Sequence, residues 1–350
     1  MARNPVIRNT SRGISRRPEH VGQNAKAGDG YVIGVDIGGS NLRVALANMQ
    51  GNVLGKWSTS TKKNSSPAAV IKQVCEGVNY LLHGNSLQHD SLRAIAAGAP
   101  GLTNTGAGVV IATSYLKGWR DVPLRNLLES TLNVPASIEN DVRVAAIGEN
   151  WRGAARGVRD FAFLAIGTGI AAGIFVNGQI VHGKHWAAGE VGYMLVPGTP
   201  EAAAKRGMPG SLESVIGGEG IKSQWTTALN GNLDSLPQNL NATEIFGYAK
   251  AGSPLAKSVL DRSARILAYA IYNISLVLNC SLFVLGGGVG ASASLLEATR
   301  RVLRSYNEPV RPKLTLSALG QDAQLIGTIR LALDTAESRH LHKQRPNIPG

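Results

Sequence analysis

The chain alternates between short apolar runs that end in glycine and longer segments with helical spacing. Three runs close to its start predict strands, with glycines supplying the turns between them. These strands are expected at Tyr31–Gly38, Asn41–Asn48 and Asn52–Ser60. Apolar residues then recur at helical spacing from Ser66 to Leu82, which predicts a helix beginning at a Ser-Ser-Pro stretch. Leu92–Ala97 predicts a further strand.

The middle of the chain predicts a junction between a strand and a helix. A hairpin near Gly106 is followed by a helical pattern at Leu124–Leu132, which ends before Pro135. A short strand is expected at Ala136–Ile138. Asn140 and Asp141 therefore lie where this strand passes into the next helix.

The second part of the chain repeats the design of the first, because it also opens on a strand, a glycine turn and a strand. An Asn-Gly pair then makes a hairpin turn. Strands are expected at Phe161–Ile166, Ala171–Asn177, Ile180–His182 and Leu282–Leu285, with one more before the final helix, and helices at about Gly210–Ala228, Thr243–Ala251, Pro254–Asn279, Ser292–Tyr306 and Ala323–Ala336.

Composition indicates a globular protein. With 350 residues, 43% of them hydrophobic, the chain can bury a substantial core, and its length suggests two lobes. Its apolar runs are far shorter than the roughly 20 residues that a membrane helix needs. Cys75 and Cys280 are the only cysteines and lie far apart, which favours reduced thiols in the core over a disulfide or a zinc site.

About half of the formal net charge of +13 lies at the two ends of the chain. Residues 1–30 carry six basic and two acidic side chains, and Arg339, Lys343 and Arg345 add three positive charges at the other end. Residues 1–30 lack the apolar stretch of a secretory signal, so they are expected to be a disordered arm of a cytoplasmic protein, and 338–350 a basic tail. Solvated basic ends disfavour nucleic-acid binding as the explanation of this charge.

Three glycine turns carry candidate phosphate-binding chemistry. Backbone N–H groups in such turns can approach phosphate oxygens closely, and the Thr168 hydroxyl adds a donor. A single turn of this kind is usually only a turn, but three in this order predict a nucleotide site that grips a polyphosphate from both sides. The candidates are Gly38, Gly39, Ser40 and Asn41; Gly167, Thr168 and Gly169; and Gly287 and Gly288.

Four carboxylates are candidates for the chemistry at these turns. Asp141 begins or caps a helix, whose positive end is expected to keep it ionised at neutral pH and available as a general base. Asp36 can hold Mg²⁺ directly or through water. Glu190 and Glu213 can accept hydrogen bonds from a polyol. Each carboxylate taken alone is equally compatible with a helix cap or a solvated surface group.

In combination these motifs resemble the ROK family of repressors and sugar kinases, whose fold is that of actin, Hsp70 and hexokinase. The resemblance covers Tyr31 to about Leu333 and rests on Asp36-Ile-Gly-Gly-Ser, Gly98-Ala-Pro-Gly101, Trp119 with Val122-Pro123-Leu124, Glu139-Asn-Asp141, Gly167-Thr-Gly-Ile170, Gly189-Glu190, Leu285-Gly-Gly-Gly-Val289 and Leu319-Gly-Gln-Asp-Ala323. It implies an α/β, ribonuclease H-like fold with two lobes around a cleft. One lobe would be residues 31–138 with a helix at about 322–337, and the other residues 139–321.

The resemblance also implies roles for single residues. Asp141 matches the catalytic base of the kinases, and the glycine turns match the ATP-binding positions. Contacts to the sugar are implied for Gly101, Asn140, Glu190, Tyr193 and Glu213. Repressors of the family carry a helix-turn-helix domain ahead of the first strand, which takes far more than 30 residues, so a kinase is expected.

The chain departs from the family at its zinc motif. Many members follow Gly-Glu-Ile-Gly with a histidine and add three cysteines to complete a structural zinc site. Here Tyr193 replaces the histidine, and Ala204, Arg206 and Ser211 stand at the cysteine positions, so no structural zinc is expected. Tyr115 stands where members commonly have asparagine. Because of Tyr115 and Tyr193, the resemblance does not determine which sugar is bound.

The expected function is transfer of the γ-phosphate of ATP, with Mg²⁺, to a hexose. Glucose is the default substrate, and a homodimer or higher homo-oligomer without a membrane or nucleic-acid partner is expected. A kinase for mannose, fructose or an N-acetylhexosamine, or one that uses polyphosphate, is an alternative. A sugar-sensing regulator without turnover is an alternative from another class.

Overall fold

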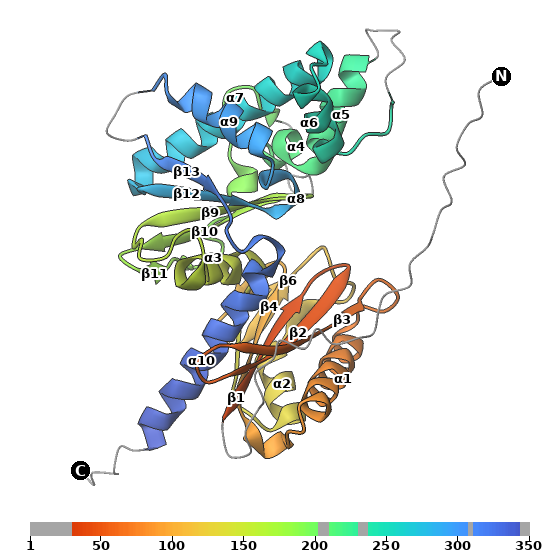
Figure 1. The fold of residues 1–350 in the computed structure, drawn as a ribbon, viewed down its shortest axis with the longest axis vertical. Coiled ribbons are helices and arrows are strands. Elements are labelled where there is room, and N and C mark those ends of the chain that lie inside the picture. Colours follow the sequence, from red (N-terminus) through yellow and green to blue (C-terminus); the bar gives the residue numbers. More distant parts are fainter. Residues whose placement is uncertain (1–29, 202–209, 230–236, 307–310, 344–350) are drawn as a thin grey trace, which may run out of the picture.

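The computed structural model describes residues 30–201, 210–229, 237–306 and 311–343 (Figure 1). The predicted N-terminal arm up to residue 29, the end of the basic tail, and the zinc-motif positions Ala204 and Arg206 lie outside these ranges. The described chain forms two lobes, each built on a five-stranded sheet. Strands and helices are mixed in both, as the sequence predicts for an α/β protein.

The first sheet has the strand order β3-β2-β1-β4-β8. Its first three strands are antiparallel hairpin neighbours, whereas β4 and β8 run parallel to β1. Alternate residues of β1 pack against α1 and α2. The elements of this lobe are β1 (Tyr31–Ile37), β2 (Asn41–Asn48), β3 (Val53–Ser60), α1 (Pro67–Gly84), η1 (His89–Ser91), β4 (Leu92–Ala99), a small sheet of β5 (Leu102–Asn104), β6 (Val109–Ala112) and β7 (Arg120–Val122), α2 (Leu124–Leu132) and β8 (Ala136–Asn140).

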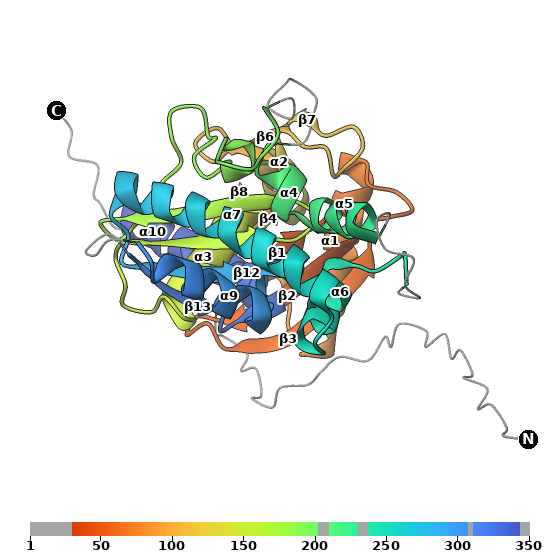
Figure 2. The ribbon, with the colours of Figure 1, turned by 90° about the horizontal axis from the view of Figure 1, so that it is seen from above.

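The second sheet repeats this topology as β11-β10-β9-β12-β13, with antiparallel pairing among its first three strands and parallel pairing among its last three. The long α7 runs across this lobe with α9 beside it (Figure 2). The elements are α3 (Asp141–Arg152), β9 (Phe161–Ile166), β10 (Ile170–Val176), β11 (Gln179–Ile180), η2 (Val191–Tyr193), α4 (Glu213–Ile216), α5 (Gly218–Leu229), α6 (Ala242–Lys250), α7 (Pro254–Leu278), β12 (Leu282–Gly286), α8 (Gly287–Gly290), α9 (Ala293–Leu303) and β13 (Lys313–Leu316).

Two helices lie between the sheets and join the lobes. After η4 (Gly320–Asp322), α10 (Ala323–Lys343) returns to the first lobe and packs Leu325, Ile329 and Leu333 on the free face of its sheet (Figure 1). α3 covers the corresponding face of the second sheet. The two helices approach so closely that a methyl group on Gly327 would lie 1.7 Å from the Val144 carbonyl oxygen. The lobes are therefore connected through helix backbones in direct contact.

The predicted elements agree with the structure in type and order, with one correction. The single helix expected at about Gly210–Ala228 is divided into α4 and α5, because Gly217 is extended at φ −68° and ψ 162°. This break brings Gly217 and Gly218 against the backbone of Gly167 and Thr168, and Gly218 donates to the Gly167 carbonyl at 2.7 Å. Sequence periodicity carries no signal for such a contact.

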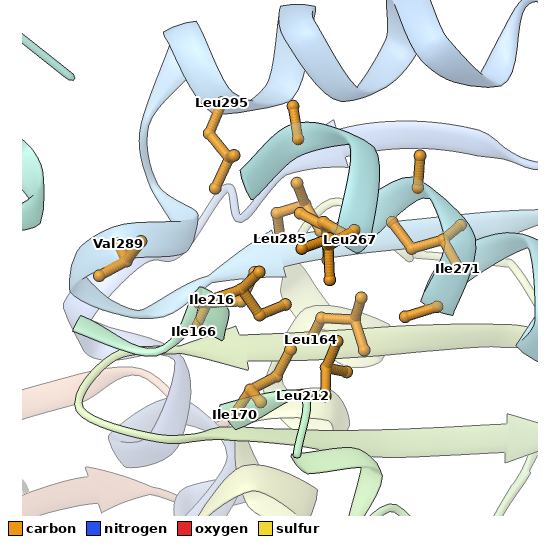
Figure 3. Close-up of a cluster of buried hydrophobic side chains, with 14 of the residues drawn as sticks. Leu164, Ile166, Ile170, Leu212, Ile216, Leu267, Ile271, Leu285, Val289 and Leu295 are labelled. Atoms are coloured by element: carbon orange, nitrogen blue, oxygen red, sulfur yellow. The ribbon is translucent and has the colours of Figure 1, made fainter. Parts of the chain in front are cut away.

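The core of the second lobe holds the second glycine turn in place. Ile166 and Ile170, on either side of the turn, are buried among Leu212 and Ile216 from the α4 region and Val289 from α8 (Figure 3). Gly167, Thr168 and Gly169 lie between these two anchors and are at least partly exposed. Within the described residues, no helix combines the length and apolarity needed to cross a bilayer.

Candidate active site at the lobe junction

Asp141 is the first residue of α3, at the point where the chain leaves β8. Asn140 caps the helix, because its Oδ1 accepts from the backbone N–H groups of Val142 and Arg143 at 3.0 and 3.1 Å. Asp141 Oδ1 accepts from the Val142 N–H at 2.9 Å and from Asn140 Nδ2 at 3.1 Å. Asn140 Nδ2 also donates to the Gly101 carbonyl at 3.0 Å. Three predicted site residues are thus linked directly.

The expectation that the helix terminus keeps Asp141 ionised is wrong for this environment. Burial raises the pKa of the Asp141 carboxyl to about 7, and the negative charges of Asp36 and Glu190 contribute to the rise. The hydrogen bond from the Val142 N–H lowers the pKa, but by less than burial raises it. Asp141 therefore exchanges its proton near neutral pH.

Asp36, at the end of β1, is held by Arg43 from β2. The guanidinium donates through Nε at 2.8 Å and Nη2 at 2.6 Å, and both bonds end on Oδ2. Oδ1 makes no hydrogen bond within the described residues, so it is the oxygen that would hold a Mg²⁺ ion directly or through water. Burial raises the pKa of Asp36 and the Arg43 charge lowers it. The residues present fit the predicted magnesium role.

Each of the first two glycine turns is closed by a backbone hydrogen bond within the turn, and the first is also held by the side chain of Thr61. Gly38 N–H donates to the Asn41 carbonyl at 2.9 Å, and Thr61 at the end of β3 donates its hydroxyl to the Gly38 carbonyl at 2.9 Å. Ser40 and Asn41 are exposed beside this turn. In the second turn Gly167 N–H donates to the Gly169 carbonyl at 2.9 Å, which leaves Thr168 exposed.

The third glycine cluster lies directly against the second. Gly287 has φ +80°, and a methyl group on it would lie 2.5 Å from the Ile166 carbonyl oxygen, so the position favours glycine for two reasons. Gly287 and Gly288 are exposed, and a methyl group added to Gly288 would meet no atom within 4 Å. This is open backbone of the kind that a nucleotide can approach.

The two predicted sugar-binding glutamates lie on the second lobe, Glu190 just before η2 and Glu213 as the first residue of α4. Glu213 Oε2 accepts from the Ile170 N–H at 3.2 Å. Burial raises the pKa of Glu190; the positive charge of Arg143 lowers it, and the negative charge of Glu213 raises it. Gly189, before Glu190, has φ +93°, and a methyl group there would lie 1.9 Å from the Ala172 carbonyl oxygen. Glu190 is thus presented from a turn that only glycine fits.

Tyr193 ends η2, three residues after Glu190, and its side chain is exposed. Among the residues that the structure describes, no group of three or more histidine, cysteine, aspartate or glutamate side chains is arranged to hold a metal ion. Ser211, at one of the family's cysteine positions, is buried and its hydroxyl has no hydrogen-bond partner within the described ranges. The segment before it, residues 202–209, is outside those ranges.

Known proteins resemble this chain over most of its length. A glucokinase from Halalkalibacterium halodurans is 32% identical over 310 residues, which are 85% of this chain and 94% of that protein. The profile described as the ROK family matches residues 32–335. The chain belongs to the ROK family. An N-acetylmannosamine kinase from Escherichia coli is 28% identical and covers 84% of this chain and 96% of its own length.

A solved ROK structure has the same fold. A ROK hexokinase from Thermus thermophilus superposes with a TM-score of 0.73 at 28% identity, over 88% of this chain and 99% of that one. This confirms the predicted two-lobed hexokinase-like fold. The lobe boundaries and the roles of single residues stay predictions.

Two further residues of this ROK protein lie among the predicted site residues. The sequence singled out Tyr115 only for its bearing on the choice of sugar, and it did not single out Arg143. Tyr115 is flanked by the first two glycine turns: a methyl group on Gly39 would lie 3.1 Å from its carbonyl oxygen, and one on Gly169 would lie 3.3 Å from its hydroxyl and 2.3 Å from Glu213 Oε2. Burial raises the pKa of the Tyr115 hydroxyl, as do the charges of Glu213, Asp141 and Glu190. Tyr115 is noticeable in the sequence only as a departure from the family motif.

Arg143 is the second such residue. It is 2% exposed, lies two residues after Asp141, and forms an ion pair with Glu139 at 2.8 Å. The spacing of an acidic and a basic residue four positions apart was the available signal. In a helix such a pair is commonly a surface feature, whereas here Glu139 lies on β8 and Arg143 on α3, so spacing alone could not reveal the burial.

Proposed function

We propose that this ROK protein is an ATP-dependent sugar kinase in which Asp141 is the general base. The sugar O–H group would lose its proton to Asp141, its oxygen would bond to the γ-phosphorus, and the bond from that phosphorus to the bridging oxygen would break to release ADP. The observation that carries the proposal is the pKa of Asp141 near 7, because a general base is most effective when its pKa is close to the working pH.

The other site residues have matching roles in this proposal. The turns at Gly38–Asn41, 167–169 and 287–288 would bind ATP through backbone N–H groups and the Thr168 hydroxyl. Asp36 would hold Mg²⁺, which supplies positive charge to the phosphate oxygens. Gly101, Asn140, Glu190, Tyr193 and Glu213 would bind the sugar.

Glucose, phosphorylated on its 6-hydroxyl, is the proposed substrate, with support from the glucokinase relative. An N-acetylhexosamine is the second candidate, supported by the N-acetylmannosamine kinase relative. We also propose a cytoplasmic homodimer or larger homo-oligomer.

A substrate panel separates these proposals. Glucose, mannose, fructose, N-acetylglucosamine and N-acetylmannosamine would each be tested with ATP and with polyphosphate, by detection of the sugar phosphate. The proposal expects the highest kcat/KM for glucose with ATP. A preference for an acetylated sugar or for polyphosphate would replace glucose or ATP in the proposal. Sugar binding without any turnover would instead support a non-catalytic regulator.

Replacement of the proposed base tests the mechanism. Asp141→Asn keeps an Oδ1 acceptor for Val142 and Asn140 but cannot accept a proton, so kcat is expected to fall about 10²- to 10⁴-fold with little change in sugar KM. Asp160→Asn is the matched control, because Asp160 accepts from the Asn177 N–H at the other end of β9 from the second turn. A wild-type kcat in Asp141→Asn would refute the mechanism.

Stability measurements on the same variant separate catalysis from folding. The folded-state pKa of Asp141 is about 7, against 3.8 without the protein environment, so ionising this side chain costs folding free energy. The cost is absent below about pH 3.8 and complete above about pH 7. Asp141→Asn should therefore unfold at a higher temperature than wild type at pH 8, and this advantage should shrink as the pH falls.

A further inference from the structure

A buried charge cluster lies beneath the proposed sugar site. Glu139 and Arg143 are 3% and 2% exposed, and Arg143 Nε donates to Glu139 Oε1 at 2.8 Å. The same oxygen accepts from the Asn140 N–H at 2.7 Å, and Oε2 lies 2.6 Å from His182 Nε2. In many proteins a buried ion pair gives no more stability than apolar side chains of similar size would give in its place. The pair is therefore not explained by stability alone.

The remaining Arg143 donors reach two other segments of the chain. Nη1 donates to the carbonyl oxygens of Trp186 and Ala188 at 3.2 and 3.5 Å, and Nη2 donates to the Thr103 carbonyl at 3.5 Å. Thr103 follows Gly101 by two residues, and Ala188 precedes Glu190 by two. One guanidinium thus contacts all the segments that carry Gly101, Asp141 and Glu190.

One of these segments has a backbone conformation that needs support. Trp186 has φ +62°, a left-handed conformation that is unfavourable for a residue with a side chain. Its carbonyl is held by Arg143, and its ring contacts the edge of His182 at a centroid distance of 5.5 Å. The cluster of Glu139, Arg143 and His182 therefore holds the strained turn that leads to Glu190.

We propose that Arg143 is a positioning residue that fixes the Gly101, Asp141 and Glu190 segments in one arrangement around the sugar. The inference rests on the proposed sugar-kinase function. The positive charge of Arg143 also lowers the pKa of Glu190, so it favours the ionised acceptor. The fork of the guanidinium is essential, since a single ammonium cannot bond Glu139 and carbonyl groups on two segments with the same geometry.

Arg143→Lys tests the fork while keeping the charge. Sugar KM is expected to rise about tenfold or more and kcat to fall, because displaced sugar contacts misalign the reacting hydroxyl, whereas ATP KM should change less than about twofold. The matched control is Arg152→Lys at the other end of α3. Arg152 also bonds two carbonyl groups, those of Gly51 and Gln50 at 2.8 and 2.9 Å, but away from the sugar residues. That variant should lose stability without a change in sugar KM.

Hydrogen–deuterium exchange provides a readout that does not depend on activity. Peptides covering residues 183–190 should exchange faster in Arg143→Lys than in wild type and in Arg152→Lys. If no sugar is phosphorylated by the wild-type protein, the proposed function fails, but this exchange result still decides the positioning role. Unchanged sugar KM and unchanged exchange in a folded Arg143→Lys protein would overturn it.

If Arg143→Lys does not fold, His182→Gln is a second variant that tests the same proposal. His182 is partly exposed, with 29% of its side chain accessible, so its replacement is better tolerated. Loss of its ring contact with Trp186 should accelerate exchange in 183–190 and raise sugar KM about threefold, the effect of one weak contact. Wild-type exchange and wild-type KM in this variant would overturn the proposal.

Discussion

At the scale of single residues, the proposed chemistry depends on how burial changes the pKa of a carboxyl group. Asp141 would be a common N-terminal helix residue, with a lowered pKa, if it were exposed. In its partly buried position, within the electrostatic reach of Asp36 and Glu190, its pKa reaches about 7. A carboxylate with this pKa can accept a proton from a substrate and release it to solvent at neutral pH.

A pH profile checks this value. The raised pKa means that the deprotonated base is lost as the pH falls through about 7, so kcat/KM should decline about tenfold per pH unit below that point and be level above it. Glu190→Gln removes a negative charge that raises the Asp141 pKa, so its profile should have the midpoint at lower pH, whatever the activity that remains. A wild-type midpoint near 4 would contradict the assignment.

Tyr115 yields a prediction about the sugar. Its hydroxyl is near Glu213 and within the electrostatic reach of Glu190, where a sugar hydroxyl would be bound. Tyr115→Phe removes one donor and should raise the KM for the preferred sugar about three- to tenfold, while ATP KM is nearly unchanged. Tyr80→Phe on α1 is the control, as another exposed tyrosine. Equal KM values in both variants would exclude a contact between Tyr115 and the sugar.

At the scale of elements, the phosphate turns depend on neighbours that lie far away in sequence. The second turn connects β9 and β10, yet its backbone is fixed by the break between α4 and α5, much later in the chain. The first turn is supported in the same way by Thr61, at the end of the third strand. Helix and strand types followed from local periodicity, but the position of this break did not.

Gly217 tests the contact between the break and the turn. A methyl group at this position would lie 2.6 Å from the Thr168 carbonyl oxygen, so Gly217→Ala should displace the turn and raise ATP KM about tenfold, with a smaller effect on sugar KM. Gly247→Ala in α6 is the control. It has open space around it and should be neutral or stabilise the protein by up to about 1 kcal/mol. A wild-type ATP KM in Gly217→Ala would show that the turn does not bind nucleotide.

At the scale of the whole molecule, two sheets of equal topology meet through α3 and α10. α3 begins with the proposed base and covers the second sheet, and α10 covers the first. Their contact at Gly148 and Gly327 makes the two lobes one structural unit around the site. The charge of Asp36, from the first lobe, therefore raises the pKa of Asp141 together with the charge of Glu190.

Gly327→Ala tests this connection. The added methyl group would overlap the Val144 carbonyl oxygen, so the free energy of unfolding should fall by about 3 kcal/mol. Because both lobes share this contact, the loss should appear in a single unfolding transition. Gly84→Ala, at the open end of α1, is the control and should be within about 1 kcal/mol of wild type in denaturant titrations. Two separate transitions in Gly327→Ala would contradict the shared unit.

Local patterns in the sequence were sufficient to predict the glycine turns, the family and most of the elements, because these depend on short-range periodicity and on residues in fixed local order. Asp141, Glu190 and Thr168 could be chosen as candidate site residues for the same reason. Three features could be seen only in the folded chain: the raised pKa of Asp141, the place of Tyr115 between the first two glycine turns, and the contacts of Arg143 with Thr103 and Ala188. Those properties arise from loss of water and from contacts between distant segments, and neither is encoded in a local pattern.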